Sequence, residues 1–548
     1  MAEPVASTSL TRRALLRLAA LGALATGLAP AAAPAAGRRA VGLRSLSIRS
    51  GRPFRGDRTL LATVSPGSAT RDKVAVRFRL DRAARVTVEA IRTNTRRKQP
   101  IWRASAKLEP GVHRFLWKPD RDTPPGSYLM RLTVVAGGKR TVYGGKRPRT
   151  LDFARAPVVN VLGVDAAFGA RSYAPGQLAR LRVSADAKVL SLQLFRAGGE
   201  EANTDRPDEL KGVAVAPPRR IRWQQRSDRP ATVTIRLGDW PTGLYFARLI
   251  TSDGRRGYAP FVVRPGVFGA RSRVAVILPT YTWQAYNYRD ADGDGWGDTW
   301  YAGGSPPVRL DRPFLNRGVP PFYRRYDLPF LRWLHQTGRE PDYLTDEDLG
   351  RFNGDALRRA YDLVVFPGHT EYVTEHQYVV TEKFRDLGGN LIFLSANNFF
   401  WKVARRGDSI RRVALWRDLK RPEIKLLGTQ YRANDDGRRQ APFVVTGAEV
   451  APWAFDGTGL TNGSTIGHEV GGYGIEIDSS SFDAPAATHI LAMIPDLFGP
   501  GVTAHMTYYE HASGAKVFSA GALDFGGSIG YSPTARRLLE NVWRRLAP

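Results

Sequence analysis

The chain of 548 residues is too long for a single hydrophobic core, so about three domains are expected. Lysine and arginine number 81 against 51 acidic residues, and the net charge of +30 suits an anionic wall polymer, or a basic surface without a specific partner. With 0 cysteines, the sequence excludes disulfides, cysteine-ligated zinc and a cysteine nucleophile, and no nucleic-acid-binding signature is present.

Residues 1–36 have the pattern of an export signal. Arg12 and Arg13 precede an apolar run at Leu18–Leu28 and small residues at Ala31–Ala36, as in twin-arginine signal peptides. The run is too short to span a bilayer comfortably, although a single-pass anchor is the alternative. We expect export by the twin-arginine route to the periplasm, the medium or the cell wall, with no integral membrane segment after signal cleavage.

Two β-sandwich modules are predicted next, over residues 37–155 and 156–266. Apolar and polar residues alternate in segments such as Val74–Leu80. Both modules contain a turn with Gly, followed by a Tyr on an alternating strand, at Tyr128 and at Tyr245. This pattern is typical of immunoglobulin-like sandwiches, which usually bind, space or buttress and seldom catalyse.

The pattern changes over residues 267–548. Val274–Pro279, Asp362–Pro367 and Asn390–Ala396 are nearly continuous apolar runs, as in strands buried on both faces of a parallel sheet. Between and after them, a capping box at Thr374–Gln377 and the Ser532-Pro533 pair predict helix starts. The fold class expected is therefore multidomain: two all-β sandwiches followed by an α/β doubly wound domain.

Polar side chains follow each of the three buried runs. Tyr286 follows the first run, His369 and Glu371 follow the second, and Asn397 follows the third. Ligands of open parallel sheets bind at the carboxyl ends of the strands, so these side chains are expected to converge. His369 and Glu371 suit a metal site or an acid/base pair, or else a hydrogen-bonded loop residue and a partner for an arginine.

Three motifs carry a resemblance to a known family. Thr282–Asn287, Gly368–Tyr372 and Asn397–Trp401 resemble the large subunit of N,N-dimethylformamidase and its relatives, over roughly residues 270–548. The resemblance implies a fold like that of class I glutamine amidotransferases without their cysteine. It also implies a mononuclear ferric iron, held by two tyrosines and one glutamate, that activates water against a small amide substrate.

Carried onto this sequence, the resemblance implies Tyr286 and Glu371 as iron ligands. The second tyrosine best matches Tyr301, with Tyr323 and Tyr326 as alternatives. Phenolate and carboxylate are hard oxygen ligands that suit a ferric ion acting as a Lewis acid. The residues implied on the substrate side, as groups that position the substrate or move protons, are His369, Asn397 and Glu469.

The segment between Tyr286 and Tyr301 departs from the family pattern. It reads as the start of a calcium loop, with Gly295 at the sharp turn and aspartates at the ligand positions: Asp290, Asp292, Asp294 and Asp298. An EF-hand would need Glu where Tyr301 stands, so we expect a calcium ion that stabilises the loop and not a sensor. A polar, Gly-rich insertion without an ion is the alternative.

The sequence favours an exported metal-dependent hydrolase of an amide-type C–N bond. The alternative is a non-catalytic wall or matrix binding protein with a degenerate enzyme domain and a calcium-bound loop. A carbohydrate-active hydrolase would instead need Glu371 paired across a groove with Asp346 or Glu469. The substrate, a homo-oligomeric state and a small partner subunit stay open.

Overall fold

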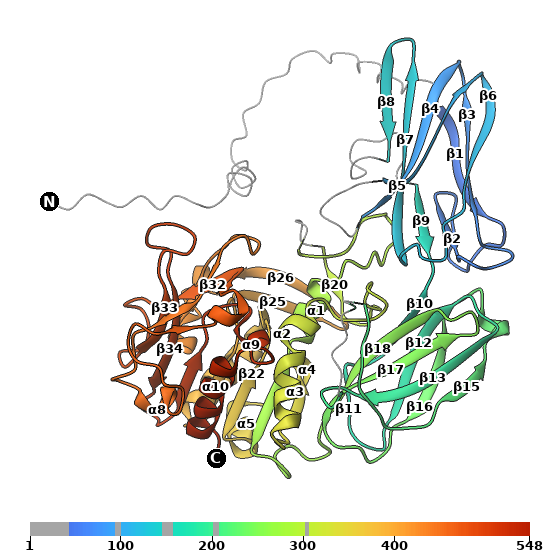
Figure 1. Cartoon of the computed structure of the whole chain (residues 1–548). Coiled ribbons are helices and arrows are strands. Elements are labelled where there is room, and N and C mark those ends of the chain that lie inside the picture. Colours follow the sequence, from blue (N-terminus) through green and yellow to red (C-terminus); the bar gives the residue numbers. More distant parts are fainter. Residues whose placement is uncertain (1–42, 94–99, 145–156, 201–205, 207, 302–305) are drawn as a thin grey trace, which may run out of the picture. The chain divides into compact units, whose positions relative to one another are not determined.

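The structure, a computed structural model, describes residues 43–93, 100–144, 157–200, 206, 208–301 and 306–548 (Figure 1). The signal peptide expected at residues 1–36 lies outside the described residues. Every helix in the described ranges is too short or too polar to cross a membrane. The protein is multidomain, and its first two folded parts are all-β.

Two sheets form the first sandwich, and alternate side chains point into its core. Strand β9 (Val158–Val161) lies beyond the boundary expected at residue 155, and it pairs with β2 (Leu61–Val64) and β7 (Gly126–Ala136) of this sandwich. One sheet has the order β1 (Leu43–Ser50), β3 (Val74–Leu80), β6 (Gly111–Trp117). The other has the order β2 (Leu61–Val64), β9 (Val158–Val161), β7 (Gly126–Ala136), β4 (Ala84–Arg92), β5 (Pro100–Leu108), with β8 (Lys139–Tyr143) paired to β7.

The second sandwich repeats this plan around a core of aliphatic and aromatic residues, among them Trp223. One sheet has the order β10 (Val164–Phe168), β12 (Leu178–Ala185), β16 (Ala231–Arg236). The other has the order β11 (Ser172–Tyr173), β18 (Arg256–Val263), β17 (Gly243–Thr251), β13 (Val189–Arg196), β14 (Val213–Ala214), with β15 (Arg219–Arg222) paired to β13.

The repeated turn-and-tyrosine pattern has the same structural role in both sandwiches. The Tyr128 hydroxyl donates to the Pro124 carbonyl at 2.7 Å, and the Tyr245 hydroxyl donates to the Pro241 carbonyl at the same distance. Each bond ties the start of a central strand to the turn before it, as tyrosine corners do in sandwich folds. A sequence pattern that recurs in both modules therefore fixes the same local geometry twice.

The C-terminal domain is built on a long mixed sheet. The predicted buried runs form β19, β22 and β24, and their parallel pairing confirms that expectation. The parallel strands are β21 (Asp342–Thr345), β19 (Val274–Leu278), β22 (Leu363–Phe366), β24 (Asn390–Phe393) and β35 (Lys516–Ser519). The sheet continues antiparallel through β34 (Ala504–Glu510), β33 (His489–Ile494), β29 (Phe443–Val445) and β30 (Thr465–Ile466).

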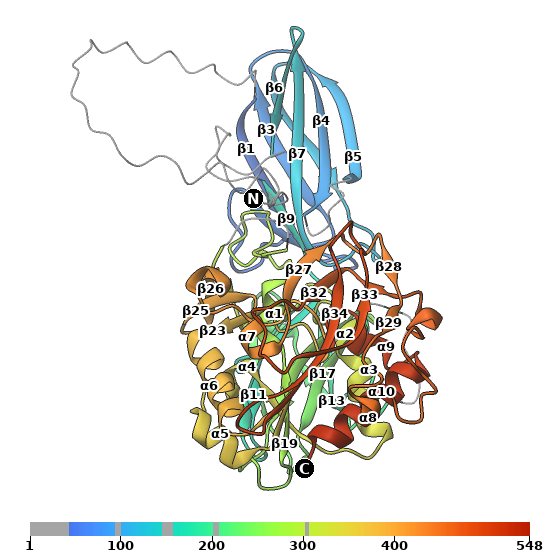
Figure 2. The same cartoon turned by 90° about the vertical axis from the view of Figure 1, so that its left-hand side faces the viewer.

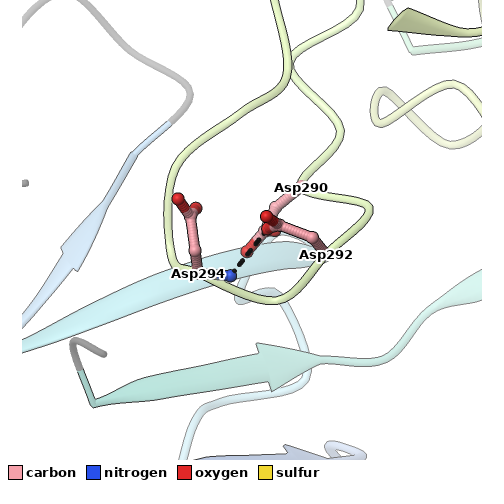
Figure 3. Close-up of side chains that lie close together, drawn as sticks. All are labelled: Asp290, Asp292 and Asp294. Atoms are coloured by element: carbon pink, nitrogen blue, oxygen red, sulfur yellow. Dashed lines mark hydrogen bonds between the residues drawn. The ribbon is translucent and has the colours of Figure 1, made fainter. Parts of the chain in front are cut away.

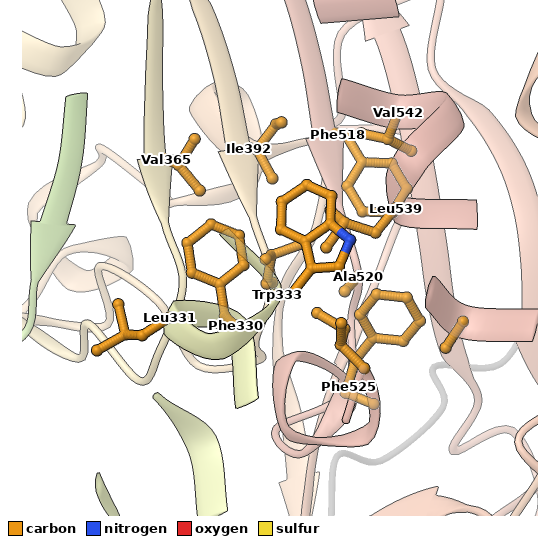
Figure 4. Packing of buried hydrophobic residues seen from close by; sticks show 14 of the residues in the cluster. Phe330, Leu331, Trp333, Val365, Ile392, Phe518, Ala520, Phe525, Leu539 and Val542 are labelled. Carbon is orange, nitrogen blue, oxygen red and sulfur yellow. The ribbon is translucent and has the colours of Figure 1, made fainter. Parts of the chain in front are cut away.

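Helices cover both faces of the parallel strands. Val276 of β19 faces α3 (Leu328–Gln336), α9 (Phe525–Ser528) and α10 (Pro533–Leu546), whereas Ile277 faces the opposite helices. Those helices are α4 (Asp346–Leu349), α5 (Gly354–Ala360) and α6 (Glu375–Asp386), and Figure 2 shows the two groups on either side of the strands. In Figure 4, Trp333 of α3 lies among Ile392, Phe518 and Leu539, which join the sheet to α10.

Local signals place the ends of two helices as predicted. Thr374 and Gln377 form a reciprocal capping box at the start of α6, and Ser532 caps α10 with Pro533 in its first turn. The likeness of the domain to class I glutamine amidotransferases stays a prediction. The remaining elements are α1 (Thr280–Ala285), β20 (Val308–Arg309), α2 (Tyr323–Tyr326), β23 (Tyr372–Thr374), β25 (Trp401–Arg406), β26 (Ser409–Leu415), α7 (Ile424–Leu427), β27 (Gln430–Asn434), β28 (Gln440–Ala441), α8 (Pro452–Phe455), β31 (Tyr473–Gly474) and β32 (Glu476–Ser479).

Candidate functional site

Loops after three parallel strands meet at the carboxyl edge of the sheet. Tyr286 ends the short helix α1 that follows β19, and His369 and Glu371 lie between β22 and β23. Asn397 follows β24, and Glu476 comes from β32. We call these five residues the buried cluster, because each of the five is wholly or largely shielded from solvent.

Two phenols contact the Glu371 carboxylate. The Tyr286 hydroxyl donates a hydrogen bond to Glu371 Oε2, and the Tyr372 hydroxyl also bonds this carboxylate. Burial raises the pKa of Glu371 to about 7 and raises the pKa values of Tyr286 and Tyr372 well above that of free tyrosine. Arg412 supplies an attraction that opposes the rise at Glu371. Glu371 and the two phenols therefore form an acidic group with little positive charge nearby.

His369 and Asn397 complete the cluster around a second carboxylate. His369 Nε2 lies 3.4 Å from Glu476 Oε2 and 3.8 Å from Glu371 Oε2, and Asn397 Nδ2 donates to Glu476 Oε2 at 2.8 Å. Burial lowers the pKa of His369 to about 3, so its imidazole is neutral at pH 7. Burial, with repulsion from Glu371, raises the pKa of Glu476 to about 8.

Two buried atoms of the cluster have no hydrogen-bond partner. They are His369 Nε2 and Asn397 Oδ1, and both belong to side chains that are at most 5% exposed. An unpaired buried polar atom costs about 1 to 3 kcal/mol. Such a cost at the edge of a sheet indicates a place for a bound group.

The backbone around the cluster is strained. Asn397 has a φ of 57°, Ile475 has 66° and Phe322 has 60°, all in the left-handed region. Outside glycine this region costs about 1 to 3 kcal/mol per residue, and for the β-branched Ile475 it is rare. Asp478 Oδ1 holds the Asn397 amide at 2.8 Å, so a fully buried carboxyl fixes the turn that presents Asn397.

The structure brings Tyr286, His369, Glu371 and Asn397 together but excludes Glu469. The Glu469 carboxylate accepts a hydrogen bond from Ser532 at the start of α10, so the glutamate of the cluster from this region is Glu476 and not Glu469. The sequence signal for Glu476 was its alternation with Asp478 along β32, which points both side chains to the same face. The cluster pairs Glu371 with Glu476, and neither Asp346 nor Glu469 takes that place.

Three tyrosines were expected as the second phenol, and they lie in different surroundings. The Tyr301 ring packs edge-on against Tyr286 with centroids 5.1 Å apart. Burial raises the pKa of the Tyr326 phenol, and repulsion from Glu476 adds to this rise. Tyr323 packs on Trp283, and burial, with repulsion from Glu200 and Asp327, raises the pKa of its phenol. Tyr323 is therefore outside the cluster, and sequence reasoning missed Tyr372.

Figure 3 shows three of the four predicted calcium ligands side by side. Ligand atoms of Asp290, Asp292 and Asp294 lie within 4.8 Å of one another. Asp298 is not part of this group, and its carboxylate accepts from the Ala291 amide at 2.9 Å. Asp290 accepts the amides of Gly293 and Gly295 at 2.7 and 2.9 Å. These bonds join residues 290–298 into one unit, which we call the aspartate loop.

A cavity of about 690 Å³ opens beside the buried cluster, and we call it the chamber. Tyr286 is on its wall, together with Phe322, Tyr473 and Tyr531. Phe322 and Tyr531 are 41% and 64% exposed, which is high for aromatic side chains. The volume lies in the range of about 300 to 1,000 Å³ that is usual for small-molecule sites.

The residues of the cluster fit a metal ion. Their donor atoms are phenol and carboxylate oxygens and one free imidazole nitrogen, a set that suits a hard or borderline cation. The raised pKa values of Glu371 and Glu476 have burial as their first cause, and a cation would remove that penalty. Donor chemistry and unpaired atoms thus agree with the ligand set that the motifs imply.

Comparisons with known proteins agree with the motifs. The N,N-dimethylformamidase beta subunit of Paracoccus aminophilus is 23% identical over 417 residues, covering 58% of this chain and 54% of that protein. The corresponding subunit from an Alcaligenes species is 23% identical over 401 residues, covering 55% and 52%. The chain therefore spans about half the length of the curated relatives it matches.

Among solved structures, red sea bream transglutaminase aligns with 42% of this chain and 32% of its own, at 15% identity and a TM-score of 0.18, too low to inform the fold. The family model described as N,N-dimethylformamidase beta subunit-like, C-terminal, matches residues 197–536, which include the whole buried cluster. Because this match takes in more than half of the sequence, the chain belongs to the N,N-dimethylformamidase beta subunit-like family.

Proposed function

We propose that the protein is an exported, iron-dependent hydrolase of an amide-type C–N bond. The observation that carries the proposal is the convergence of Tyr286, Glu371 and His369, from separate loops, into one buried cluster. Family membership supports amide hydrolysis. Because the chain spans about half of its relatives' length, the substrate and any small partner subunit or homo-oligomer are proposals for this protein.

Tyr286 and Glu371 would hold the iron, with one further phenol. Tyr301 was expected there with Tyr326 as an alternative, which its burial near Glu476 supports, and the contacts add Tyr372, since it already bonds Glu371. An iron ion at this position supplies a Lewis acid for the amide carbonyl and lowers the pKa of water. The phenol side chains and Glu371 keep bulk water away from the proposed iron site and supply the negative charge that would balance the ion.

The other residues of the cluster position the reactants and move protons. Glu476, which a bound cation would keep ionised, takes the proton of the attacking water and delivers it to the departing amine nitrogen, and Asn397 Nδ2 orients its carboxylate at 2.8 Å. The neutral His369, whose free Nε2 lies 3.4 Å from that carboxylate, can relay the proton. Asn397 Nδ2 donates to Glu476, so the free atom of Asn397 is Oδ1, which accepts a hydrogen bond from the water or from a substrate N–H.

Metal content and hydrolysis test this proposal together. We expect the purified protein to contain iron, to absorb in the visible range as a tyrosinate–iron complex does, and to release an amine from small amides. Glu371→Ala should lose both the iron and the activity. Glu449→Gln, an exposed change outside the cluster, serves as the matched control. Iron retained in full by Glu371→Ala would refute the site.

For the aspartate loop we propose a calcium ion that stabilises the loop. The support is the grouping of three carboxylates in a loop whose Gly293 and Gly295 both have positive φ, at 75° and 92°. Carboxylate oxygens are the ligands that calcium prefers. Calorimetric titration of the chelator-treated protein with calcium tests the site, and the Asp292→Asn variant should bind more weakly.

Export by the twin-arginine route is a separate proposal, which rests on Arg12 and Arg13. Replacing both arginines with lysine should leave the protein in the cytoplasm of a host that has this pathway. Fractionation and immunoblotting measure the outcome. Unchanged export of the variant would refute this part of the proposal and leave the proposed chemistry untouched.

One surface favours the second candidate function, binding of an anionic wall polymer. On the outer face of the first sandwich, Arg44 lies opposite Arg79 and Arg77 lies opposite Arg114. Arg44 pairs with Asp81 at 2.5 Å, but in the described ranges no ion pair involves the exposed Arg77, Arg79 or Arg114. Like charges on neighbouring strands repel, and an anionic chain laid across them would relieve that repulsion.

Cosedimentation with isolated cell walls tests this candidate. The combined changes Arg77→Gln, Arg79→Gln and Arg114→Gln should release the protein from the walls and leave hydrolysis unchanged. If the protein binds walls through this face and contains no iron, the non-catalytic function is the better description of the protein.

A further inference from the structure

The chamber is much larger than dimethylformamide requires. Its volume is about 690 Å³, whereas dimethylformamide adds only two methyl groups to a formamide unit. Cavities of this size usually hold drug-sized molecules. Tyr286 forms part of the wall and its hydroxyl bonds Glu371, so a ligand in the chamber lies against one residue of the buried cluster.

The chamber is aromatic, and its aromatic groups are presented to a ligand. The Phe322 ring stacks on Tyr326 at 5.5 Å and lies 6.2 Å from the Tyr286 ring, held by a left-handed backbone that a bulky residue seldom adopts. Tyr531 contributes a second exposed ring, and Tyr473 is part of the same wall. Aromatic rings packed around a cavity favour a flat aromatic guest.

The positive and negative charges on the chamber wall do not cancel completely. Arg325 approaches the Asp524 carboxylate at 3.5 Å, so these two groups largely cancel. Arg324 is also on the wall, its Nε is buried without a hydrogen-bond partner, and in the described ranges it forms no ion pair. A buried guanidinium nitrogen without a partner favours a carboxylate, which it can bind by charge-assisted hydrogen bonds.

We propose that the substrate is an aromatic amide bearing a carboxylate, with its ring between Phe322 and Tyr531 and its carboxylate on Arg324. This rests on the proposed hydrolase function and names its substrate class. In the reaction, a C–O bond forms between water and the carbonyl carbon and the C–N bond breaks. One water proton goes to the nitrogen, and the products are a carboxylic acid and an aromatic amine.

Binding is measured first, with ligands that have no C–N bond. 4-Acetylbenzoate should bind about tenfold more tightly than acetophenone by calorimetry, because it adds one charge-assisted contact. Arg324→Gln should abolish that difference, and Arg359→Gln, an exposed change on α5, should preserve it. Tyr531→Ala should weaken the binding of both ligands. Because Tyr531 is exposed, this variant should fold normally, and it tests the chamber even if the Arg324 variant misfolds.

Hydrolysis is measured next, with three formamides that share the reacting group. 4-Formamidobenzoate should be cleaved fastest, formanilide more slowly and dimethylformamide slowest. Equal binding of both ketones in the wild type, or an unchanged preference in Arg324→Gln, would overturn the substrate class. Selective binding without cleavage of any amide would support the ligand class and overturn the hydrolase proposal, so the two failures are distinguishable.

Discussion

The buried cluster and the aspartate loop both gather acidic oxygens, yet they satisfy them differently. In the loop, backbone amides occupy the carboxylates, as Gly293 and Gly295 do for Asp290. In the cluster, phenols share Glu371, and atoms of His369 and Asn397 are left without partners. A loop that supplies its own hydrogen-bond donors needs an ion only for extra stability. The cluster, in contrast, has little positive charge and contains polar atoms without hydrogen-bond partners.

After Glu371→Ala, which should lose all activity, the largest expected effect is on Glu476. Glu476→Gln removes the group proposed to move protons, so kcat/KM should fall about a hundredfold, since general acid–base catalysis contributes about 10² to 10⁴. Glu469→Gln, in the same region but bonded to Ser532, is the matched control and should keep its activity. Steady-state kinetics on the best amide substrate measures both. Equal losses of activity in the two variants would contradict the assignment of Glu476 as the glutamate that moves protons.

The tyrosines come next. Tyr286→Phe removes a proposed iron ligand together with its hydrogen bond to Glu371, so it should lower the visible absorption and reduce activity at least about tenfold, which corresponds to about 1.4 kcal/mol. Tyr301→Phe, Tyr326→Phe and Tyr372→Phe identify the second phenol, since one of them should also shift the absorption band. Tyr323→Phe lies outside the cluster and should keep the spectrum. A shift in that variant alone would contradict the geometry.

The buried carboxyl of Asp346 extends the comparison, because hydrogen-bond donors occupy its Oδ2 oxygen. Asp346 accepts from the Thr280 hydroxyl at 2.9 Å and the Tyr281 amide at 2.8 Å, and burial raises its pKa to about 7. Above pH 4 the unfolded state releases this proton and the folded state retains it up to about pH 7. The carboxyl therefore makes folding less favourable as the pH rises through this window.

The Asp346→Asn variant has no titratable group at this position, so its stability should lack the pH dependence that Asp346 causes. Between pH 4 and 7 the free energy of unfolding of the wild type should fall relative to the variant by up to about 1.4 kcal/mol per pH unit. Urea unfolding across this range measures the difference. A constant difference between the two proteins would mean that Asp346 is ionised in the folded state.

The smallest effect is expected in the aspartate loop. Calcium at several times its Kd should stabilise the wild type by about 1 kcal/mol, through binding to the folded state. Asp292→Asn should remove this gain, and Asp298→Asn, whose carboxylate bonds the Ala291 amide, should keep part of it. Thermal unfolding with calcium and with chelator measures both. Stabilisation that persists in Asp292→Asn would place the ion elsewhere.

Local patterns in the sequence were enough to predict the strands and helix ends around the site. The apolar runs that became β19, β22 and β24 are buried on both faces, and the capping box at Thr374 and the cap at Ser532 depend on residues close in the chain. The convergence of Tyr286, Glu371 and Asn397 followed from the rule that parallel strands present their carboxyl ends together.

What the sequence could not supply depends on contacts between distant segments. Glu476 reaches His369 only because β32 pairs with β27, and nothing near Glu469 indicated that Ser532 would bind it. Tyr372 was missed because it directly follows Glu371, and neighbours in extended chain usually point apart. Similarly, β9 joins the first sandwich across the expected boundary through pairing with β2.

Anomalous X-ray diffraction at the iron absorption edge tests the central claim most directly. Crystals of the iron-loaded protein should show a single strong peak in bonding contact with Tyr286 Oη and a Glu371 carboxylate oxygen. A peak confined to the aspartate loop, or a fully loaded protein with no peak near Glu371, would contradict the proposed iron site.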